Sequence, residues 1–179
     1  MEEDACFCQN NIIMVEIKKV HKVYLSLGSN LGDKLGNLGK CMDLIKSHIG
    51  QIAERSQVYR SAAWGFQSDH AFYNMCLEIK TALSVEDLME KVLKMEKSMG
   101  RKRSVKGYID RIVDIDILFF DNLILESPDI VVPHPRIELR RFVLVPLAEI
   151  NAAYNHPVHN RSIAELLNDC EDKNQVLPI

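Results

Sequence analysis

The sequence lacks an apolar run of transmembrane length, and it lacks an excess of basic residues. Its formal net charge is −3 at pH 7 and its pI is near 6.1, which argues against a general nucleic-acid-binding protein and restricts any basic patch to a local one. The N-terminus begins with Met1, Glu2, Glu3 and Asp4, whereas a secretory signal peptide begins with basic residues. We therefore expect a cytoplasmic protein with no nucleic-acid or membrane partner.

The cysteine pattern indicates neither a disulfide framework nor a Cys-x-x-Cys site. None of the five cysteines belongs to a Cys-x-x-Cys pair, and an odd number does not complete a disulfide framework. Cys41 and Cys76 fall within apolar patterns and are predicted to be buried, whereas Cys6 and Cys8 stand near the N-terminus. This usage is typical of a reducing compartment.

A Walker-type phosphate-binding motif is also absent. A glycine-rich turn containing Gly28, Gly32 and Asp33 follows the first predicted strand, but no Gly-Lys-Ser/Thr sequence accompanies it. Glycine permits the backbone angles of a tight turn, and Asp33 is suited to cap a helix. We interpret this stretch as a strand-to-helix turn rather than a phosphate cradle.

Length and hydrophobic periodicity indicate one α+β domain. A chain of 179 residues with 47% hydrophobic residues has the size of a single domain, and we expect residues 1–20 to form an N-terminal tail and residues 21–179 to form the domain. The predicted order of strand, helix, strand, strand, helix and strand is that of a ferredoxin-like βαββαβ core with a mainly antiparallel sheet, helices packed on it and a C-terminal extension. The predicted strands are residues 21–27, 51–59, 72–81, 110–120 and 142–145, with helices at 34–49 and 85–99, a hairpin of 123–125 and 130–132, a helical turn at 146–150 and a capping box at Ser162 and Glu165.

Two aspartates interrupt the apolar strand at residues 110–120. Asp114 and Asp116 stand two positions apart and therefore project from the same face of the strand, with Cα atoms roughly 6.6 Å apart. Carboxylates at this spacing can bind one or two hard cations, and two such groups are costly to bury unless they are paired or bind metal. The alternative is an edge strand with solvated aspartates or ordinary salt bridges. A basic run immediately before the strand favours the metal site.

Cationic side chains lie on both sides of this strand in the sequence. Arginine clamps phosphate with its forked geometry, and Mg²⁺ held by carboxylates bridges phosphate oxygens. A basic loop alone is typical of a solvated surface, but combined with the two aspartates it indicates phosphoryl transfer from a polyphosphate such as ATP. The cationic residues are Arg101, Lys102, Arg103 and Lys106 before the strand, and His134, Arg140 and Arg141 after it.

A polar residue within an apolar strand suggests a second substrate. Asn74 lies in the predicted strand 72–81, and its amide can match the lactam edge of a flat heterocycle. Aromatic residues are core residues by default, yet several lie in loops or at strand ends near polar groups. These are Trp64, Phe72, Tyr108 and Phe142.

Several stretches together resemble the 6-hydroxymethyl-7,8-dihydropterin pyrophosphokinase family of folate biosynthesis. They occur in family order and span about residues 23–150. The most specific are the RxxDxDIL stretch and the HPR stretch that leads to RxFVLVPL. The matching stretches are residues 24–33 (YLSLGSNLGD), 59–61 (YRS), 72–74 (FYN), 111–118 (RIVDIDIL), 133–136 (PHPR) and 140–147 (RRFVLVPL).

The resemblance implies the reaction and the residues that carry it. The hydroxymethyl oxygen of the pterin would attack the β-phosphorus of ATP, giving the pterin diphosphate and AMP, with two Mg²⁺ ions held by Asp114 and Asp116. We expect a monomer acting on ATP and a dihydropterin. By resemblance the catalytic residues are Arg101, Arg103, Asp114 and Asp116, the ATP-binding residues are Glu96, Arg103, Arg111, Ile117, His134 and Arg140, and the pterin-binding residues are Ser61, Ala62, Trp64, Phe72, Asn74, Tyr108 and Phe142.

The chain departs from the family pattern near this strand. Ile109 and Asp110 stand where the family usually has Gly-Pro, so we expect a changed approach of the preceding loop and an added negative charge beside the phosphate clamp. Strict alternation would place Arg111 on the face opposite the aspartates, so it is expected at the mouth of the strand or beyond a kink. A non-catalytic binding module and another Mg²⁺-dependent phosphoryl transferase are the alternative functions. Neither alternative requires the arginines, both aspartates and the Asn74 pocket together.

Overall fold

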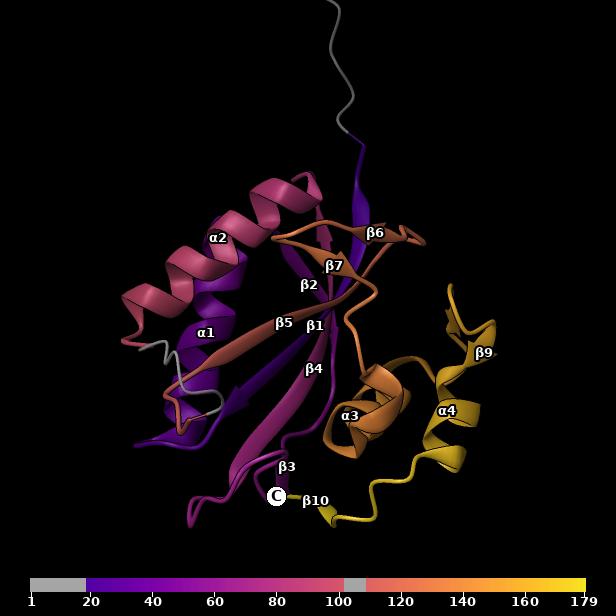
Figure 1. Cartoon of the computed structure of the whole chain (residues 1–179). Coiled ribbons are helices and arrows are strands. Elements are labelled where there is room, and N and C mark those ends of the chain that lie inside the picture. The colour runs from indigo at the N-terminus through magenta and orange to yellow at the C-terminus, as the bar shows by residue number, and fades with distance from the viewer. Residues whose placement is uncertain (1–18, 102–108) are drawn as a thin grey trace, which may run out of the picture.

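The computed structural model describes residues 19–101 and 109–179. These residues fold around an antiparallel sheet (Figure 1). The strands follow the spatial order β10-β3-β4-β1-β5, and β2 also pairs with β4. All of these pairings are antiparallel, so the predicted α+β class with a mainly antiparallel sheet is confirmed. The strands are β1 (His21–Ser29), β2 (Gln51–Arg55), β3 (Tyr59–Ser61), β4 (Phe72–Thr81), β5 (Asp114–Phe120) and β10 (Val176–Pro178).

Two capped helices cover one face of the sheet. Helix α1 (Lys34–His48) begins after Asp33, whose side chain accepts a hydrogen bond from the backbone N of Gly36. Helix α2 (Val85–Ser98) begins after Ser84, whose hydroxyl accepts from Asp87 N. Both predicted N-caps are therefore confirmed. The apolar faces of these helices pack on β1, β4 and β5 and form the larger part of the hydrophobic core.

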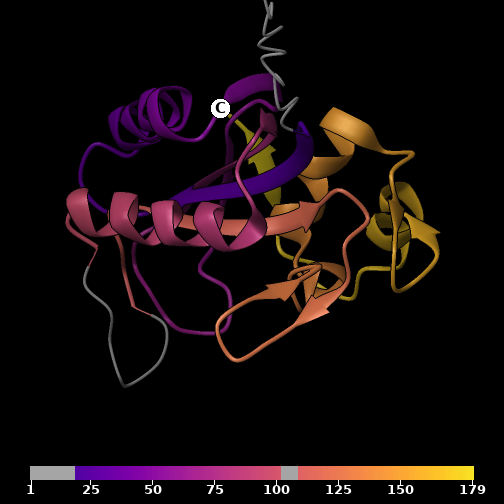
Figure 2. The ribbon, with the colours of Figure 1, turned by 90° about the horizontal axis from the view of Figure 1, so that it is seen from above.

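The two helices that follow β5 lie on the other side of the sheet (Figures 1 and 2). Helix α3 (Arg141–Asn151) packs on β4, and helix α4 (Ile163–Asp169) packs on α3. The capping box at Ser162 and Glu165 is confirmed at the start of α4. The remaining elements are the hairpins β6 (Leu125–Glu126) with β7 (Val131–Val132) and β8 (Asn155–His156) with β9 (Arg161–Ser162), and the 3-10 turn η1 (Ile137–Leu139).

Three predicted strands were wrong in extent or type, and one of them, predicted at residues 110–120, begins only at Asp114. Residues 142–145, predicted as a strand, form the first turn of α3, where the buried residues Val143, Leu144 and Leu147 follow a helical spacing. A short apolar run does not distinguish a strand from a helix, and packing against the sheet decided the outcome. The predicted strand 51–59 is interrupted at Ser56, whose hydroxyl accepts a hydrogen bond from Cys76 N.

The register of the sheet sets the candidate site. Gly28 pairs with Asn74 on one side and with Asp114 on the other, and Ser26 pairs in the same way with Cys76 and Asp116. Paired residues of antiparallel strands point to the same face. Both aspartates therefore lie on the α3 side of the sheet, as the alternation predicted.

Phe119 of β5 is buried, as an apolar strand residue is expected to be, but it lies on the other face of the sheet from the one that regular alternation gives it. The register shifts between Tyr24 and Leu25, so Phe119 pairs with Tyr24 and packs on the α3 side instead of beside Ile115 and Ile117. A β-bulge of this kind moves a side chain to the other face, and the alternation of the sequence does not reveal it. Among the described residues, no helix has the length and apolarity needed to cross a membrane.

Candidate active site

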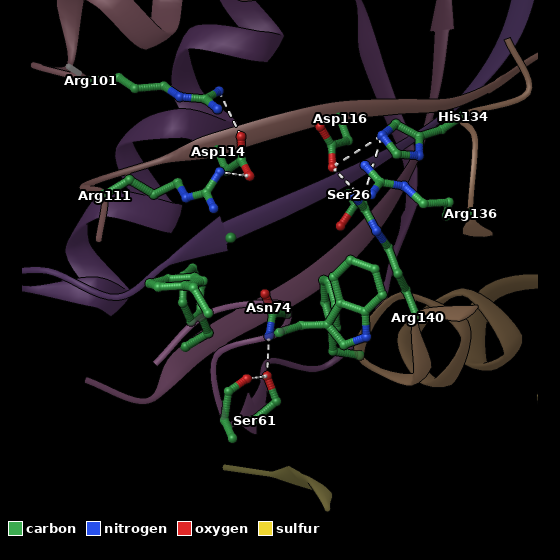
Figure 3. Close-up of a pocket in the computed structure, with 16 residues that line it drawn as sticks. Ser26, Ser61, Asn74, Arg101, Arg111, Asp114, Asp116, His134, Arg136 and Arg140 are labelled. Atoms are coloured by element: carbon green, nitrogen blue, oxygen red, sulfur yellow. Dashed lines mark hydrogen bonds and ion pairs between the residues drawn. The ribbon is translucent and has the colours of Figure 1, made fainter. Parts of the chain in front are cut away.

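A pocket of about 180 Å³ opens on the face of the sheet opposite α1 and α2 (Figure 3). Its walls come from the ends of β1, β4 and β5, the loop after β3, and the segment that joins β7 to α3. It therefore collects residues that are far apart in the sequence. The lining residues are Ser26, Gly28, Ser61, Ala62, Trp64, Phe66, Phe72, Asn74, Arg101, Arg111, Asp114, Asp116, His134, Arg136, Arg140 and Phe142.

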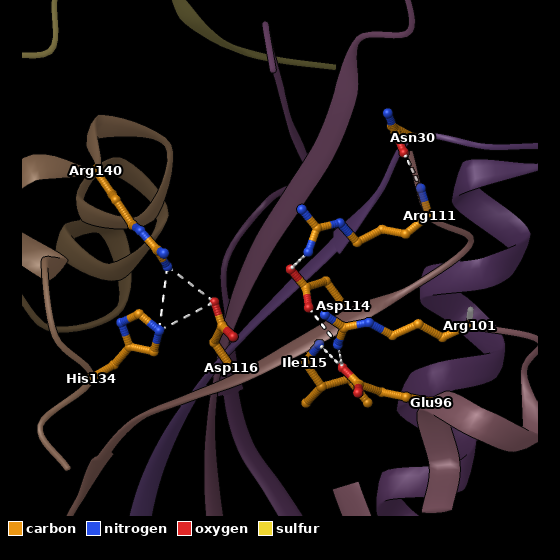
Figure 4. A network of polar contacts seen from close by, with 9 residues as sticks. All are labelled: Asn30, Glu96, Arg101, Arg111, Asp114, Ile115, Asp116, His134 and Arg140. Atoms are coloured by element: carbon orange, nitrogen blue, oxygen red, sulfur yellow. Dashed lines mark hydrogen bonds and ion pairs between the residues drawn. The ribbon is translucent and has the colours of Figure 1, made fainter. Parts of the chain in front are cut away.

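Asp114 lies between two arginines (Figure 4). Nη1 of Arg111 donates to its Oδ2 at 2.6 Å, and Nη1 of Arg101 lies 2.6 Å from its Oδ1. Strand β5 begins only at Asp114, so Arg111 precedes the regular alternation and its side chain folds back to this carboxylate. Arg111 therefore lies at the mouth of the strand, as predicted.

Burial and like charge act on the same carboxylate. Burial raises the pKa of Asp114 above its ordinary value, and the neighbouring charge of Asp116 raises it further, while Arg111 and Arg101 oppose the shift. The positive side chains therefore compensate the two carboxylates only in part. A cation placed at this pair would relieve both the burial cost and the mutual repulsion.

Asp116 faces Arg140 and His134, which belong to the segment before α3. Nη1 of Arg140 donates to its Oδ2 at 3.1 Å, and Nε2 of His134 lies 3.7 Å from the same oxygen. Arg140 is buried, and burial lowers the pKa of His134 below its ordinary value despite the nearby carboxylate. This pair therefore presents one permanent positive charge and one imidazole that favours its neutral form.

The two carboxylates have the donor chemistry that Mg²⁺ requires. They project from one face of β5, and Mg²⁺ is usually bound by one or two carboxylates together with water and substrate phosphates. Within residues 19–101 and 109–179, no cluster of three His, Cys, Asp or Glu side chains is arranged to hold a metal. The described residues thus fit a metal that arrives with a phosphate ligand.

Glu96 fixes the position of β5 from the end of α2. Its buried carboxylate accepts a hydrogen bond from Ile115 N at 2.8 Å and forms an ion pair with Arg101. Burial raises the pKa of Glu96, and Arg101 opposes the shift. Glu96 thus connects the strand that carries the aspartates to an arginine of the pocket.

Aromatic rings and a buried amide form the opposite wall. The rings of Trp64 and Phe142 have centroids 6.3 Å apart, and those of Phe66 and Phe72 meet edge-to-face at 6.1 Å. Asn74 is buried, and its Nδ2 donates to Ser61 Oγ at 2.9 Å.

Ser61 fixes the orientation of this amide. Its hydroxyl donates in turn to Ala62 O at 3.1 Å. These hydrogen bonds, drawn in Figure 3, hold the amide of Asn74 in one orientation. In this orientation its Oδ1 is directed toward Gly28. Aromatic surfaces beside an oriented amide suit a flat heterocycle.

Arginine side chains connect the two walls. The guanidinium of Arg140 lies 5.1 Å from the Trp64 ring centroid, and that of Arg136 lies 5.7 Å from it. Arg136 adopts a left-handed backbone conformation with φ of 71°, which turns the chain immediately before η1. The tryptophan ring is therefore shared by the aromatic wall and the cationic wall.

The structure brings most of the predicted site residues together. Ser61, Ala62, Trp64, Phe72, Asn74, Arg101, Arg111, Asp114, Asp116, His134, Arg140 and Phe142 all line the pocket. Glu96 lies behind Arg101, whereas the Ile117 side chain packs in the core on the other face, so only its backbone is available to a ligand. Arg103 and Tyr108 lie outside the described residues.

Sequence reasoning did not identify four lining residues. Arg136 is the last residue of the quoted PHPR stretch, where it was given no role, and could have been inferred from it. Ser26 and Gly28 enter through their cross-strand pairing with Asp116 and Asp114, which requires the register. Phe66 belongs to the loop after β3, and nothing in its local sequence distinguished it from a core aromatic.

Comparison with known proteins identifies the chain's relatives. The model of the family 7,8-dihydro-6-hydroxymethylpterin-pyrophosphokinase (HPPK) matches residues 24–152. The 2-amino-4-hydroxy-6-hydroxymethyldihydropteridine pyrophosphokinase of Aquifex aeolicus is 38% identical over 143 residues, which cover 80% of this chain and 88% of that protein. The folic acid synthesis protein fol1 of Pneumocystis carinii is 35% identical over 162 residues, covering 89% of this chain but only 22% of that much longer protein.

Solved structures share the fold. Wild-type HPPK-DHPS of Plasmodium falciparum, crystallised with SDX-DHP, superposes with a TM-score of 0.68 over 86% of this chain and 45% of that chain. The sequence identity over this superposition is 17%, so the likeness supports the architecture alone.

Proposed function

Because this chain belongs to the 7,8-dihydro-6-hydroxymethylpterin-pyrophosphokinase family, we propose that it transfers pyrophosphate from ATP to the hydroxymethyl group of 6-hydroxymethyl-7,8-dihydropterin, a step of folate biosynthesis. One observation supports the placement of this reaction in the pocket. Two carboxylates with arginines form one wall, and an oriented amide with aromatic rings forms the other. The first wall suits a metal-bound polyphosphate, and the second suits a pterin.

The reaction forms one bond and breaks one. The hydroxymethyl oxygen attacks the β-phosphorus of ATP while the bond from that phosphorus to the oxygen bridging it to the α-phosphate breaks. The products are the pterin diphosphate and AMP, and the hydroxyl proton passes to solvent. An enzyme for such a transfer acts chiefly by aligning the two substrates and by stabilising the charge on the transferring phosphates.

Asp114 and Asp116 are proposed to hold two Mg²⁺ ions. Bound Mg²⁺ would neutralise negative charge on the phosphates. The raised pKa of Asp114 supports this role, because a partly buried pair of like charges gains more from a cation than a fully solvated pair does.

The arginines are proposed to exchange partners when the nucleotide binds. Arg111 contacts Asp114 and Arg140 contacts Asp116, so both are held beside the place where phosphate oxygens would lie. A phosphate can replace a carboxylate in the arginine fork without a new geometry. We assign Arg101 and Arg103 to the transferring phosphates, and Arg111, His134 and Arg140 to the nucleotide, with Glu96 positioning Arg101.

The pterin is proposed to lie between the aromatic rings with its edge on Asn74. The hydrogen bond to Ser61 holds one side of this amide, so its orientation is set before a ligand arrives. Trp64, Phe72 and Phe142 would cover the faces of the heterocycle. Ser61, Ala62 and Tyr108 complete the proposed pterin site, and we propose that residues 21–179 act as one domain in a monomer.

A product assay tests the function. Purified protein with ATP, Mg²⁺ and 6-hydroxymethyl-7,8-dihydropterin should form AMP without ADP, and the variant Asp116→Ala should form neither. Formation of ADP would indicate another phosphoryl transferase. Failure of folded protein to form AMP would indicate a binding module.

A further inference from the structure

Asp110 joins three segments at the border of the pocket. Its Oδ1 accepts one hydrogen bond from Ser68 Oγ at 2.6 Å and another from Asn30 Nδ2 at 2.6 Å. Ser68 belongs to the loop between β3 and β4, Asn30 follows the end of β1, and Asp110 directly precedes Arg111. We call these three side chains the latch. They connect three segments of the chain by hydrogen bonds: Asn30 and Ser68 are 38 positions apart in the sequence, and Ser68 and Asp110 are 42 positions apart.

The loop is bound to the latch at several points. Ser68 Oγ also accepts from His70 N at 3.0 Å, and Asn30 Nδ2 lies 3.5 Å from His70 O. Close by, Lys34 Nζ donates to Ala71 O at 3.1 Å. The end of the loop that enters β4 is thus held by the first strand and by the start of the first helix.

The latch also reaches Arg111. Oδ1 of Asn30 accepts from Arg111 N at 2.7 Å, and Asn30 N donates to Arg111 O at 3.1 Å (Figure 4). The amide of Asn30 is therefore engaged on both sides, by Asp110 and by the backbone of Arg111. The Arg111 guanidinium lies 5.7 Å from the ring centroid of Phe72, the first residue of β4.

Asp110 accepts the hydrogen bonds of the latch in its charged form. The hydrogen bond from Ser68 lowers the pKa of Asp110, and the bond from Asn30 lowers it further, so the group accepts both bonds as a carboxylate. The sequence suggested an added negative charge beside the phosphate clamp. In the structure Ser68 and Asn30 engage this carboxylate.

We propose that Asp110 is a positioning residue for the pterin, acting through the loop that carries Trp64 and Phe66. Both aromatic residues line the pocket, and the latch holds the far end of their loop. A loop held in place before binding does not lose that conformational freedom when the ligand arrives. The inference rests on the proposed function, because it assigns the aromatic wall to the pterin.

Two substitutions at Asp110 separate hydrogen bonding from charge. Both donors bind the same oxygen, so Asp110→Asn keeps an acceptor for each of them, whereas Asp110→Ala removes both bonds. Asp110→Ala should raise the KM for the pterin by about tenfold, the order expected from losing two hydrogen bonds. The KM for ATP and kcat should stay within about twofold, because the substitution removes only the bonds to Ser68 and Asn30 and leaves the bonds between Asn30 and the Arg111 backbone in place. Asp110→Asn and the control Asp69→Ala, an exposed carboxylate on the same loop, should retain the wild-type pterin KM.

Fluorescence reports on the loop without turnover. Trp64 is the only tryptophan of the chain, so acrylamide quenching of its emission measures the exposure of this loop. Quenching should increase in Asp110→Ala and stay at the wild-type level in Asp110→Asn. Ser68→Ala removes one of the two bonds to Asp110, so it should give an intermediate increase in quenching. This variant serves as the test if Asp110→Ala does not fold.

The possible results test the proposed role of the latch and the proposed function separately. Wild-type quenching and pterin KM in both Asp110→Ala and Ser68→Ala would overturn the latch, as would an Asp110→Asn variant as impaired as Asp110→Ala. Absence of AMP formation by the wild-type protein would overturn the proposed function. The quenching comparison would still decide whether the latch holds the loop.

Discussion

Asn74 and Asp114 lie on opposite sides of Gly28, in one row across β4, β1 and β5. A Cβ atom added to Gly28 would lie 3.1 Å from Asn74 Oδ1 and 3.9 Å from Asp114 Cβ. The glycine therefore leaves open the space between the amide assigned to the pterin and the carboxylate assigned to the metal. We infer that the two substrates meet above this residue.

Gly28→Ala should impair the placement of both substrates while the fold is retained. The added methyl group presses on Asn74 and enters the space where the hydroxymethyl group would approach the phosphate. We expect kcat/KM for the pterin to fall by about 10-fold to 100-fold, since misplacement of reacting groups by about 1 Å has effects of this size. Steady-state kinetics with the pterin varied, together with thermal unfolding, would measure this.

Gly39→Ala is the matched control. Gly39 lies in α1, and an added Cβ there would meet nothing within 4 Å. This change should leave the kinetics unaltered and should stabilise the protein by about 0.5–1 kcal/mol, because alanine is the better helix residue. A Gly28→Ala enzyme with wild-type kinetics would show that the substrates do not meet at this row.

Asp114→Asn should separate activity from stability. Burial raises the pKa of Asp114 first, and the charge of Asp116 raises it further, so folding favours the protonated form. The stability that this carboxyl contributes is complete below its ordinary pKa of 3.8 and is lost as the pH rises through the higher folded-state pKa. A neutral amide should therefore keep or raise the free energy of unfolding at pH 7, while kcat falls by about a thousandfold.

Urea unfolding at pH 7 and product analysis measure the two effects of Asp114→Asn independently. A large loss of stability would show that the ion pairs with Arg101 and Arg111 outweigh the burial of the charge. Near-normal turnover would remove the metal assignment from this residue.

Removal of Glu96 should destabilise the junction between α2 and β5. Glu96→Ala leaves the buried N–H of Ile115 without its acceptor, which should cost about 1–3 kcal/mol in the free energy of unfolding. Glu96→Gln keeps an acceptor and should cost less. Glu90→Ala removes only the exposed ion pair with Lys94 and should change stability by less than about 0.5 kcal/mol. Equal losses for Glu96→Ala and Glu90→Ala in chemical denaturation would contradict this role.

His156 should make stability depend on pH below 6.5. Burial, together with a smaller effect of the charge of His159, lowers its pKa from 6.5 to about 4. Its neutral Nδ1 accepts from Val158 N and His159 N. The unfolded chain binds the proton more readily between pH 4 and 6.5, so stability is complete above pH 6.5 and falls by up to about 3 kcal/mol as the pH drops through this window. In His156→Asn, which keeps an acceptor, urea unfolding from pH 4 to 7 should show a flatter profile, and an unchanged slope would exclude His156 as its source.

Sequence patterns correctly predicted the features that depend only on residues close together in the sequence. The caps at Asp33 and Ser84 depend on a side chain and a backbone N–H three residues later, so the sequence contains both partners. The strand 72–81 and the common face of Asp114 and Asp116 follow from a period of two. These predictions held because no distant contact opposed them.

Long-range contacts decided the rest. Residues 142–145 have strand-like composition, yet they begin a helix because their apolar side chains are buried against the sheet. Gly28 enters the site only through the pairing of three strands, and the latch at Asp110 depends on partners 42 and 80 positions away. Such contacts are properties of the folded chain and leave no local signal.

The fate of the β-phosphate tests the central claim most directly. With ATP labelled at the β-phosphorus, Mg²⁺ and 6-hydroxymethyl-7,8-dihydropterin, the label should move into the pterin product while the AMP stays unlabelled. Asp114→Asn should slow this transfer by about a thousandfold. A pterin product that takes up only the γ-phosphate, with the β-label remaining in ADP, would contradict the account.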